Sequence, residues 1–180
     1  MNITRRIAIR NLLLITAGTL LLPSCIDGGA SIKLTNLDVD GEQESILGSL
    51  TDAIIPQTDT PGAKDISAHL FALKMVDDCY TKEEQKAFML GFKDFNKLVK
   101  DKYKMSFAQL GAVQQEELLT LLEDGKKVPE GVQSFYSSVK SFTVLGYTTS
   151  KYYLTEVKNF NLIPGKYQGS VPVNPAKASV

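Results

Sequence analysis

The chain has 180 residues, of which 43% are hydrophobic and 22% charged, and its formal charge is zero. These totals allow one domain of ordinary globular composition. Three of the 20 basic residues and none of the 20 acidic residues lie in residues 1–24, so the remainder is mildly acidic. This balance speaks against nucleic acid as a partner, because binding phosphates requires a concentrated basic face.

Residues 1–24 have the organisation of a signal peptide. Arg5 and Arg6 belong to a basic start, and an apolar run follows over residues 12–22. That run has the length of a signal-peptide core and is too short to span a bilayer permanently. Arg5 and Arg6 resemble a twin-arginine export signal, which serves proteins that fold before they cross the membrane.

The leader ends in Leu22-Pro23-Ser24-Cys25, which resembles the lipobox of bacterial lipoproteins. In that motif the cysteine thiol takes the lipid, so Cys25 is the candidate lipidation site. We expect a periplasmic or cell-envelope protein that is anchored to a membrane by lipid. Residues 25–41 are predicted to form a tether, because the stretch from Gly28 to Gly41 is short, polar and aperiodic.

Beyond the tether, apolar residues recur at helical spacing. The first stripe predicts a helix that ends before Pro56 and carries Ile46, Leu47, Leu50, Ala53 and Ile54. Residues 57–64 contain Thr58-Asp59-Thr60-Pro61-Gly62, which favours a turn because Pro fixes φ and Gly tolerates the left-handed conformation. A second helix is predicted from about Asp65 to Asp78.

The next helix starts with a capping box, in which Thr81 and Glu84 satisfy backbone N–H groups. Four positions of this helix form an apolar stripe that we assign to the core, namely Phe88, Phe92, Phe95 and Val99. A short turn follows Ser106, and a Leu-rich helix over residues 113–123 ends at Gly125. The last long helix runs toward Gly146 with Val132, Phe135, Tyr136, Val139 and Phe142 in register.

No segment alternates over enough residues to form a sheet. The predicted fold class is therefore all-α, a compact bundle of about five helices over residues 42–155. Residues 156–180 lose the helical period and are predicted to be an extended tail. This tail contains Phe160 and Tyr167, whose rings either fold back on the bundle or lie on a partner.

The chain offers few groups for chemistry of its own. Its only histidine, His69, is expected to make a surface hydrogen bond with Asp65, one turn earlier. Cys79 is expected to be a helix-terminal thiol in the core or in an interface, with a bond to a partner chain as the alternative. An acidic cluster is formed by Asp77, Asp78, Glu83 and Glu84. It could bind a hard cation, but two of the four are also explained as residues of the first turn of a helix, where acidic side chains are favoured. We assign no catalytic, cofactor-binding or metal-binding residue.

Four segments in order resemble the gluconate 2-dehydrogenase subunit 3 family. The first is Ile54-Ile55-Pro56-Gln57-Thr58-Asp59-Thr60-Pro61-Gly62-Ala63, and the second is Asp78-Cys79-Tyr80-Thr81 before an acidic helix start. The third is Leu145-Gly146-Tyr147-Thr148-Thr149-Ser150, and the fourth is Pro164-Gly165-Lys166-Tyr167-Gln168-Gly169. Many members of this family have Cys where this chain has Ser170, so any thiol role at that place does not carry over.

The resemblance implies an accessory role. Members of this family are small helical subunits of membrane-bound, flavin-dependent dehydrogenases that oxidise gluconate, glucose or other sugars in the periplasm. The large subunit carries FAD and the active site, and a cytochrome c subunit often takes the electrons. The small subunit is thought to assist maturation and export of the flavoprotein. On this resemblance the chain would hold no cofactor itself and would bind the FAD-containing large subunit.

Candidate partner-binding residues come from the matched segments and from the tyrosines nearby. They are Thr58, Asp59, Thr60, Pro61, Gly62, Gly146, Tyr147, Tyr152, Tyr153, Pro164, Gly165 and Tyr167. Tyrosine is a favourable anchor because it buries apolar area while keeping one hydrogen bond. Two alternatives stay open here: the tyrosines pack internally, and residues 58–62 serve only as the turn between two helices. The alternative function is that of a freestanding helical envelope lipoprotein that binds another protein.

Overall fold

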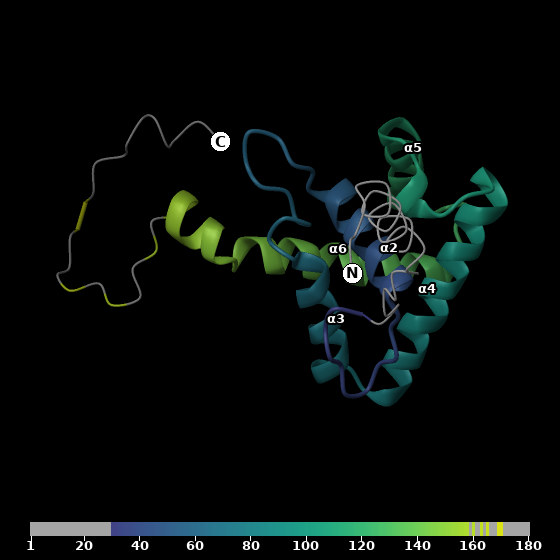
Figure 1. Ribbon diagram of the computed structural model, residues 1–180, viewed down its shortest axis with the longest axis horizontal. Helices are drawn as coiled ribbons and strands as arrows, with labels where there is room; N and C mark the ends of the chain where they lie inside the picture. The colour runs from purple at the N-terminus through teal and green to yellow at the C-terminus, as the bar shows by residue number, and fades with distance from the viewer. Residues whose placement is uncertain (1–29, 159, 161–162, 164, 166–168, 171–180) are drawn as a thin grey trace, which may run out of the picture.

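The protein is a set of α-helices in a computed structural model that describes residues 30–158, 160, 163, 165, 169 and 170 (Figure 1). In chain order the elements are α2 (Gly41–Ile54), α3 (Ala68–Cys79), α4 (Lys82–Tyr103), η1 (Phe107–Gln109), α5 (Ala112–Asp124), α6 (Glu130–Thr148) and η2 (Tyr153–Val157). The described residues contain no β-strand, so the predicted all-α fold class is confirmed.

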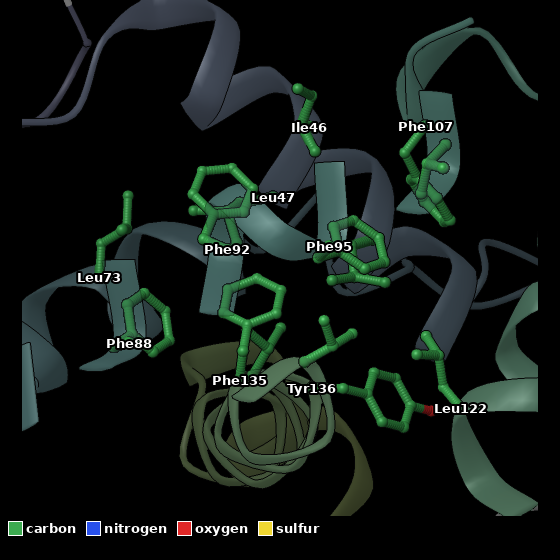
Figure 2. Packing of buried hydrophobic residues seen from close by; sticks show 14 of the residues in the cluster. Ile46, Leu47, Leu73, Phe88, Phe92, Phe95, Phe107, Leu122, Phe135 and Tyr136 are labelled. Atoms are coloured by element: carbon green, nitrogen blue, oxygen red, sulfur yellow. The ribbon is translucent and has the colours of Figure 1, made fainter. Parts of the chain in front are cut away.

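The core forms where α6 packs across α4. The ring centroid of Phe135 on α6 lies 5.0 Å from that of Phe88, 5.2 Å from Phe92 and 5.5 Å from Phe95 (Figure 2). Each of these three α4 rings is at most 4% exposed. Burying such a ring contributes on the order of 2 kcal/mol. The predicted aromatic stripe is therefore confirmed as core.

Local sequence signals place several helix ends as predicted. At the start of α4, the Glu84 N–H donates to Thr81 Oγ1 and the Thr81 N–H donates to the Glu84 carboxylate, which confirms the capping box. At the end of α5, Gly125 adopts the left-handed conformation with a φ of 66°. This conformation strains residues that carry a Cβ, so a glycine there ends the helix.

The second predicted helix begins later than expected, at Ala68 instead of Asp65. The Asp65 carboxylate accepts a hydrogen bond from the Gly62 N–H at 2.9 Å, so this residue closes the preceding loop. Ser67 then takes the left-handed conformation with a φ of 60°, which breaks helical geometry before α3 starts. The apolar spacing of the sequence fits a helix that starts at Asp65, but the backbone of residues 65–67 is not α-helical.

The expected free tether over residues 25–41 is corrected where the structure describes it. Residues 30–40 pack on the helices, with Leu37 and Val39 buried and Ile32 and Leu34 partly buried against the core. The side chain of Asp77 on α3 is fully buried and accepts hydrogen bonds from the backbone of this segment. Residues 30–40 therefore belong to the folded domain.

Three sequence predictions on the leader, at Arg5, Arg6 and Cys25, lie outside the described residues. Within the described part, every helix is too short or too polar to cross a membrane. At the other end, helical structure continues to Val157 through η2. Phe160 is 56% exposed, so this ring of the predicted tail is not buried in the core.

Candidate interaction surface

The loop between α2 and α3 is closed by its own backbone. The Ala63 N–H donates to the Ile55 carbonyl at 2.9 Å and brings the two ends of the loop together. At Gly62, an added Cβ would lie 2.7 Å from the Gln57 nitrogen, closer than real Cβ atoms approach. Only glycine fits there without moving the loop, while Thr58 and Asp59 at the loop tip are exposed. The predicted turn is thus a fixed structure with a polar, accessible tip.

Tyr147 near the end of α6 holds this loop. Its hydroxyl donates a hydrogen bond of 2.9 Å to the Pro61 carbonyl, across 86 residues of sequence. Its ring also makes edge contacts with Tyr152 and Tyr153, at centroid distances of 6.5 and 6.0 Å. Figure 1 shows the loop beside the C-terminal half of α6, which extends away from the other helices. Two of the sequence segments singled out above therefore form one structural unit.

Gly146 has a packing role in this unit. A Cβ added to Gly146 would lie 2.8 Å from Cδ1 of Phe71 on α3. The absence of a side chain therefore lets α6 approach α3 closely. Gly146 and Gly62 are both buried, so these two candidate partner-binding residues shape the surface from beneath.

Three exposed apolar side chains lie on the last part of α6 or just beyond its end. Val144 is 44% exposed, Leu145 is 42% exposed and Phe160 is 56% exposed. We call Thr58, Asp59, Val144, Leu145 and Phe160 the α6-end surface. Neighbouring exposed apolar residues commonly mark a protein-binding site. The sequence reasoning missed Val144 and Leu145, although both fall outside the apolar register of α6.

The other candidate residues divide by exposure. Tyr147, Tyr152 and Tyr153 are half-buried, and for Tyr147 the internal alternative holds, because its hydroxyl bonds to Pro61. Thr60 is half-buried and Gly165 is exposed. Two candidates, Pro164 and Tyr167, lie outside the described residues.

Comparison with protein families gives one match. The model described as "Gluconate 2-dehydrogenase subunit 3" matches residues 41–165, about two thirds of the chain. The chain belongs to this family. Comparisons with curated proteins and with solved structures give no match. The match begins at the first residue of α2 and includes the closed loop, Tyr147 and η2.

The family name makes subunit 3 a component of a gluconate dehydrogenase complex and implies that it associates with other subunits. The match covers the α6-end surface completely, from Thr58 to Phe160. It starts after residues 30–40, the segment that packs on Asp77. The α6-end surface therefore lies inside the matched range, and the packed N-terminal segment lies outside it.

The histidine of this subunit 3 chain is placed differently from the prediction. The expected hydrogen bond between Asp65 and His69 is wrong, because the Asp65 carboxylate bonds to Gly62. The ring of His69 faces Gly48 on α2, and its buried Nδ1 has no hydrogen-bond partner in the described structure. Burial lowers the pKa of His69, with Glu44 opposing and Lys64 reinforcing this effect. His69 therefore has a neutral ring that packs between α2 and α3.

The remaining polar candidates are Cys79 and the acidic cluster. Cys79 is a free, exposed thiol, so the expectation of a core position is wrong while an interface position stays a prediction. The acidic cluster is split: Asp77 is buried, Asp78 pairs with Lys74 at 3.0 Å and Glu84 caps α4. Among the described residues, no three His, Cys, Asp or Glu side chains lie close enough to hold a metal ion.

Proposed function

We propose that this chain is the non-catalytic small subunit of a periplasmic, membrane-bound, FAD-dependent sugar dehydrogenase of the gluconate or glucose type. Its role is to assist maturation, export and anchoring of the flavoprotein large subunit. FAD and the active site belong to that partner, and a cytochrome c subunit is a further candidate partner. Export would use Arg5 and Arg6, and anchoring would use lipid on Cys25.

The α6-end surface is the observation that carries this proposal. It lies within the range matched by the family, and it combines exposed apolar side chains at the end of α6 with the exposed tip of a loop whose shape is fixed by Gly62 and Tyr147. A preformed surface binds with little cost in ordering, which favours stable association. Exposed polar Thr58 and Asp59 on the loop, together with exposed apolar Val144 and Leu145 on α6, give the mixed character of a subunit interface.

The test is co-expression of the chain with an FAD-dependent sugar dehydrogenase large subunit from the same genome. Leu145→Asp places a charge on the α6-end surface, and Val113→Asp places the same charge on an exposed apolar position of α5. We expect the first variant to reduce periplasmic flavoprotein and its bound FAD at least tenfold. The second should leave both unchanged.

Deletion of the whole chain gives the reference for complete loss of function. Equal yield, FAD content and export of the flavoprotein with and without the chain would contradict the proposal and favour a freestanding lipoprotein. If the flavoprotein yield were normal with Leu145→Asp but fell on deletion of the chain, the accessory role would stand. The interface would then lie outside the α6-end surface. Turnover of a sugar by the isolated chain would contradict the non-catalytic role.

A further inference from the structure

One face of α4 carries five lysines and one exposed leucine. Counting along the helix, exposed positions recur every three or four residues and therefore lie on one side. These positions are Lys86, Leu90, Lys93, Lys97, Lys100 and, at the helix end, Lys104. We call these five lysines the lysine stripe. At 1.5 Å per residue the stripe is about 27 Å long.

The lysine stripe points away from the core. The opposite side of α4 carries the buried rings Phe88, Phe92 and Phe95. Among the described residues, no lysine of the stripe makes an ion pair, whereas Lys102 on another side of the helix pairs with Glu117 at 2.8 Å. Asp94 and Asp101 border the stripe without pairing with it. The five charges are therefore available to an external anion.

The start of the folded chain lies next to this stripe. Gln43 in the first turn of α2 lines one shallow hollow with Lys93, Lys97 and Lys100. The neighbouring Glu44 accepts hydrogen bonds of 2.6 Å from Ser31, one residue after the first described residue. Cys25 precedes that first residue by five positions, which span at most about 17 Å. A lipid on Cys25 would therefore hold the membrane near the start of α2.

We propose that the lysine stripe lies against anionic phospholipid headgroups and orients the domain on its membrane. The inference rests on the lipid anchor of the proposed function and adds a second, electrostatic contact to it. Lysines beside an anionic leaflet are attracted to it, and an acyl anchor gains from such a basic patch. In Figure 1, α4 and the far end of α6 lie on opposite sides of the molecule. This orientation leaves the α6-end surface free for a partner.

The test is the rate at which an amine-reactive acetylating reagent modifies each lysine, measured by mass spectrometry. The mature lipidated chain is bound to vesicles of phosphatidylcholine, with or without 30% phosphatidylglycerol. Exposed Lys151 and Lys158, beyond the end of α6, serve as internal controls. We expect anionic vesicles to slow modification of the stripe about fivefold relative to the controls. The effect should vanish in 0.5 M NaCl, because salt screens surface charge.

A triple variant (Lys93→Gln, Lys97→Gln, Lys100→Gln) should lose the protection of Lys86 and Lys104, and the control variant (Lys151→Gln, Lys158→Gln) should keep it. A chain bound to both vesicle types with equal modification of the stripe would overturn the inference and leave the anchor intact. Binding only to anionic vesicles, with the stripe protected, would support the contact between the stripe and the headgroups. It would contradict the proposed lipid anchor on Cys25. Binding to neither, or protection only by the flavoprotein, would overturn the inference.

Discussion

Asp77 is expected to be the most sensitive polar position in the fold. Its Oδ1 accepts hydrogen bonds from the Asn36 and Leu37 N–H groups at 2.7 and 2.9 Å, and its Oδ2 accepts one from Thr35 at 2.9 Å. The Asp77 side chain has no exposed area, so its carboxylate depends on these backbone donors in place of water. The proposed perturbation is Asp77→Asn, which keeps the shape and removes one acceptor.

The cost of Asp77→Asn follows from this geometry. In the best orientation the asparagine oxygen still accepts the hydrogen bonds from the Asn36 and Leu37 N–H groups. Its NH2 group then faces the Thr35 N–H, and two donors cannot bond to each other. The Thr35 N–H, which is part-buried, then loses its partner at a cost near the lower end of about 1–3 kcal/mol, and two charge-assisted bonds weaken. We expect the free energy of unfolding in urea, followed by circular dichroism, to fall by about 3 kcal/mol.

Asp78→Asn is the matched control, because Asp78 is half exposed and bonds only to Lys74. We expect it to change the free energy of unfolding by less than about 0.5 kcal/mol. Limited proteolysis should cut residues 30–40 faster in Asp77→Asn alone. If both variants were equally stable, or if cleavage of this segment were unchanged, Asp77 would not hold the segment as described.

The same contacts give Asp77 a pH signature. Burial alone would raise the pKa of this carboxyl, but hydrogen bonds from Thr35, Asn36 and Leu37 and the nearby Lys74 hold it below the ordinary value of 3.8. The contribution to stability is therefore complete above that value and is lost as the pH falls through the lower, folded-state pKa. Wild type should lose this stability as the pH falls below 3.8, and Asp77→Asn should not show this loss.

Three further predictions concern packing and titration. Tyr147→Phe removes the bond to the Pro61 carbonyl and should lower the free energy of unfolding in urea by about 1 kcal/mol. Gly91→Ala forces a Cβ against the backbone of Gly131 and should cost about 1–3 kcal/mol, whereas Gly131→Ala meets nothing and should be neutral or slightly stabilising. Because burial lowers the pKa of His69, wild type should lose stability as the pH falls below 6.5, and His69→Gln should not; equal pH profiles would contradict this.

Features set by neighbouring residues could be predicted from the sequence. The capping box needs only Thr81 and Glu84, three positions apart, and the aromatic stripe of α4 needs only helical spacing. Both signals act within one or two turns, so the sequence contains all the information they require. The turn at Pro61 and Gly62 was predictable for the same reason.

Features that depend on distant partners could not be predicted. The sequence places Asp77 in an acidic cluster, and nothing near it indicates that backbone donors 40 to 42 positions earlier surround it. Residues 30–40 suggested a tether, because their apolar residues follow no helical period. The bond from Tyr147 to Pro61 likewise depends on how α6 lies across the bundle. Long-range packing decided all three cases.

The most direct test of the account is site-specific photo-cross-linking in the assembled complex. A photoreactive phenylalanine analogue at Leu145 would report on the α6-end surface, and the same analogue at Val113 would report on an exposed apolar control position. The account predicts a covalent adduct between position 145 and the FAD-containing subunit, and none from position 113. A complex that forms adducts only from position 113, or an isolated chain that oxidises the sugar itself, would contradict it.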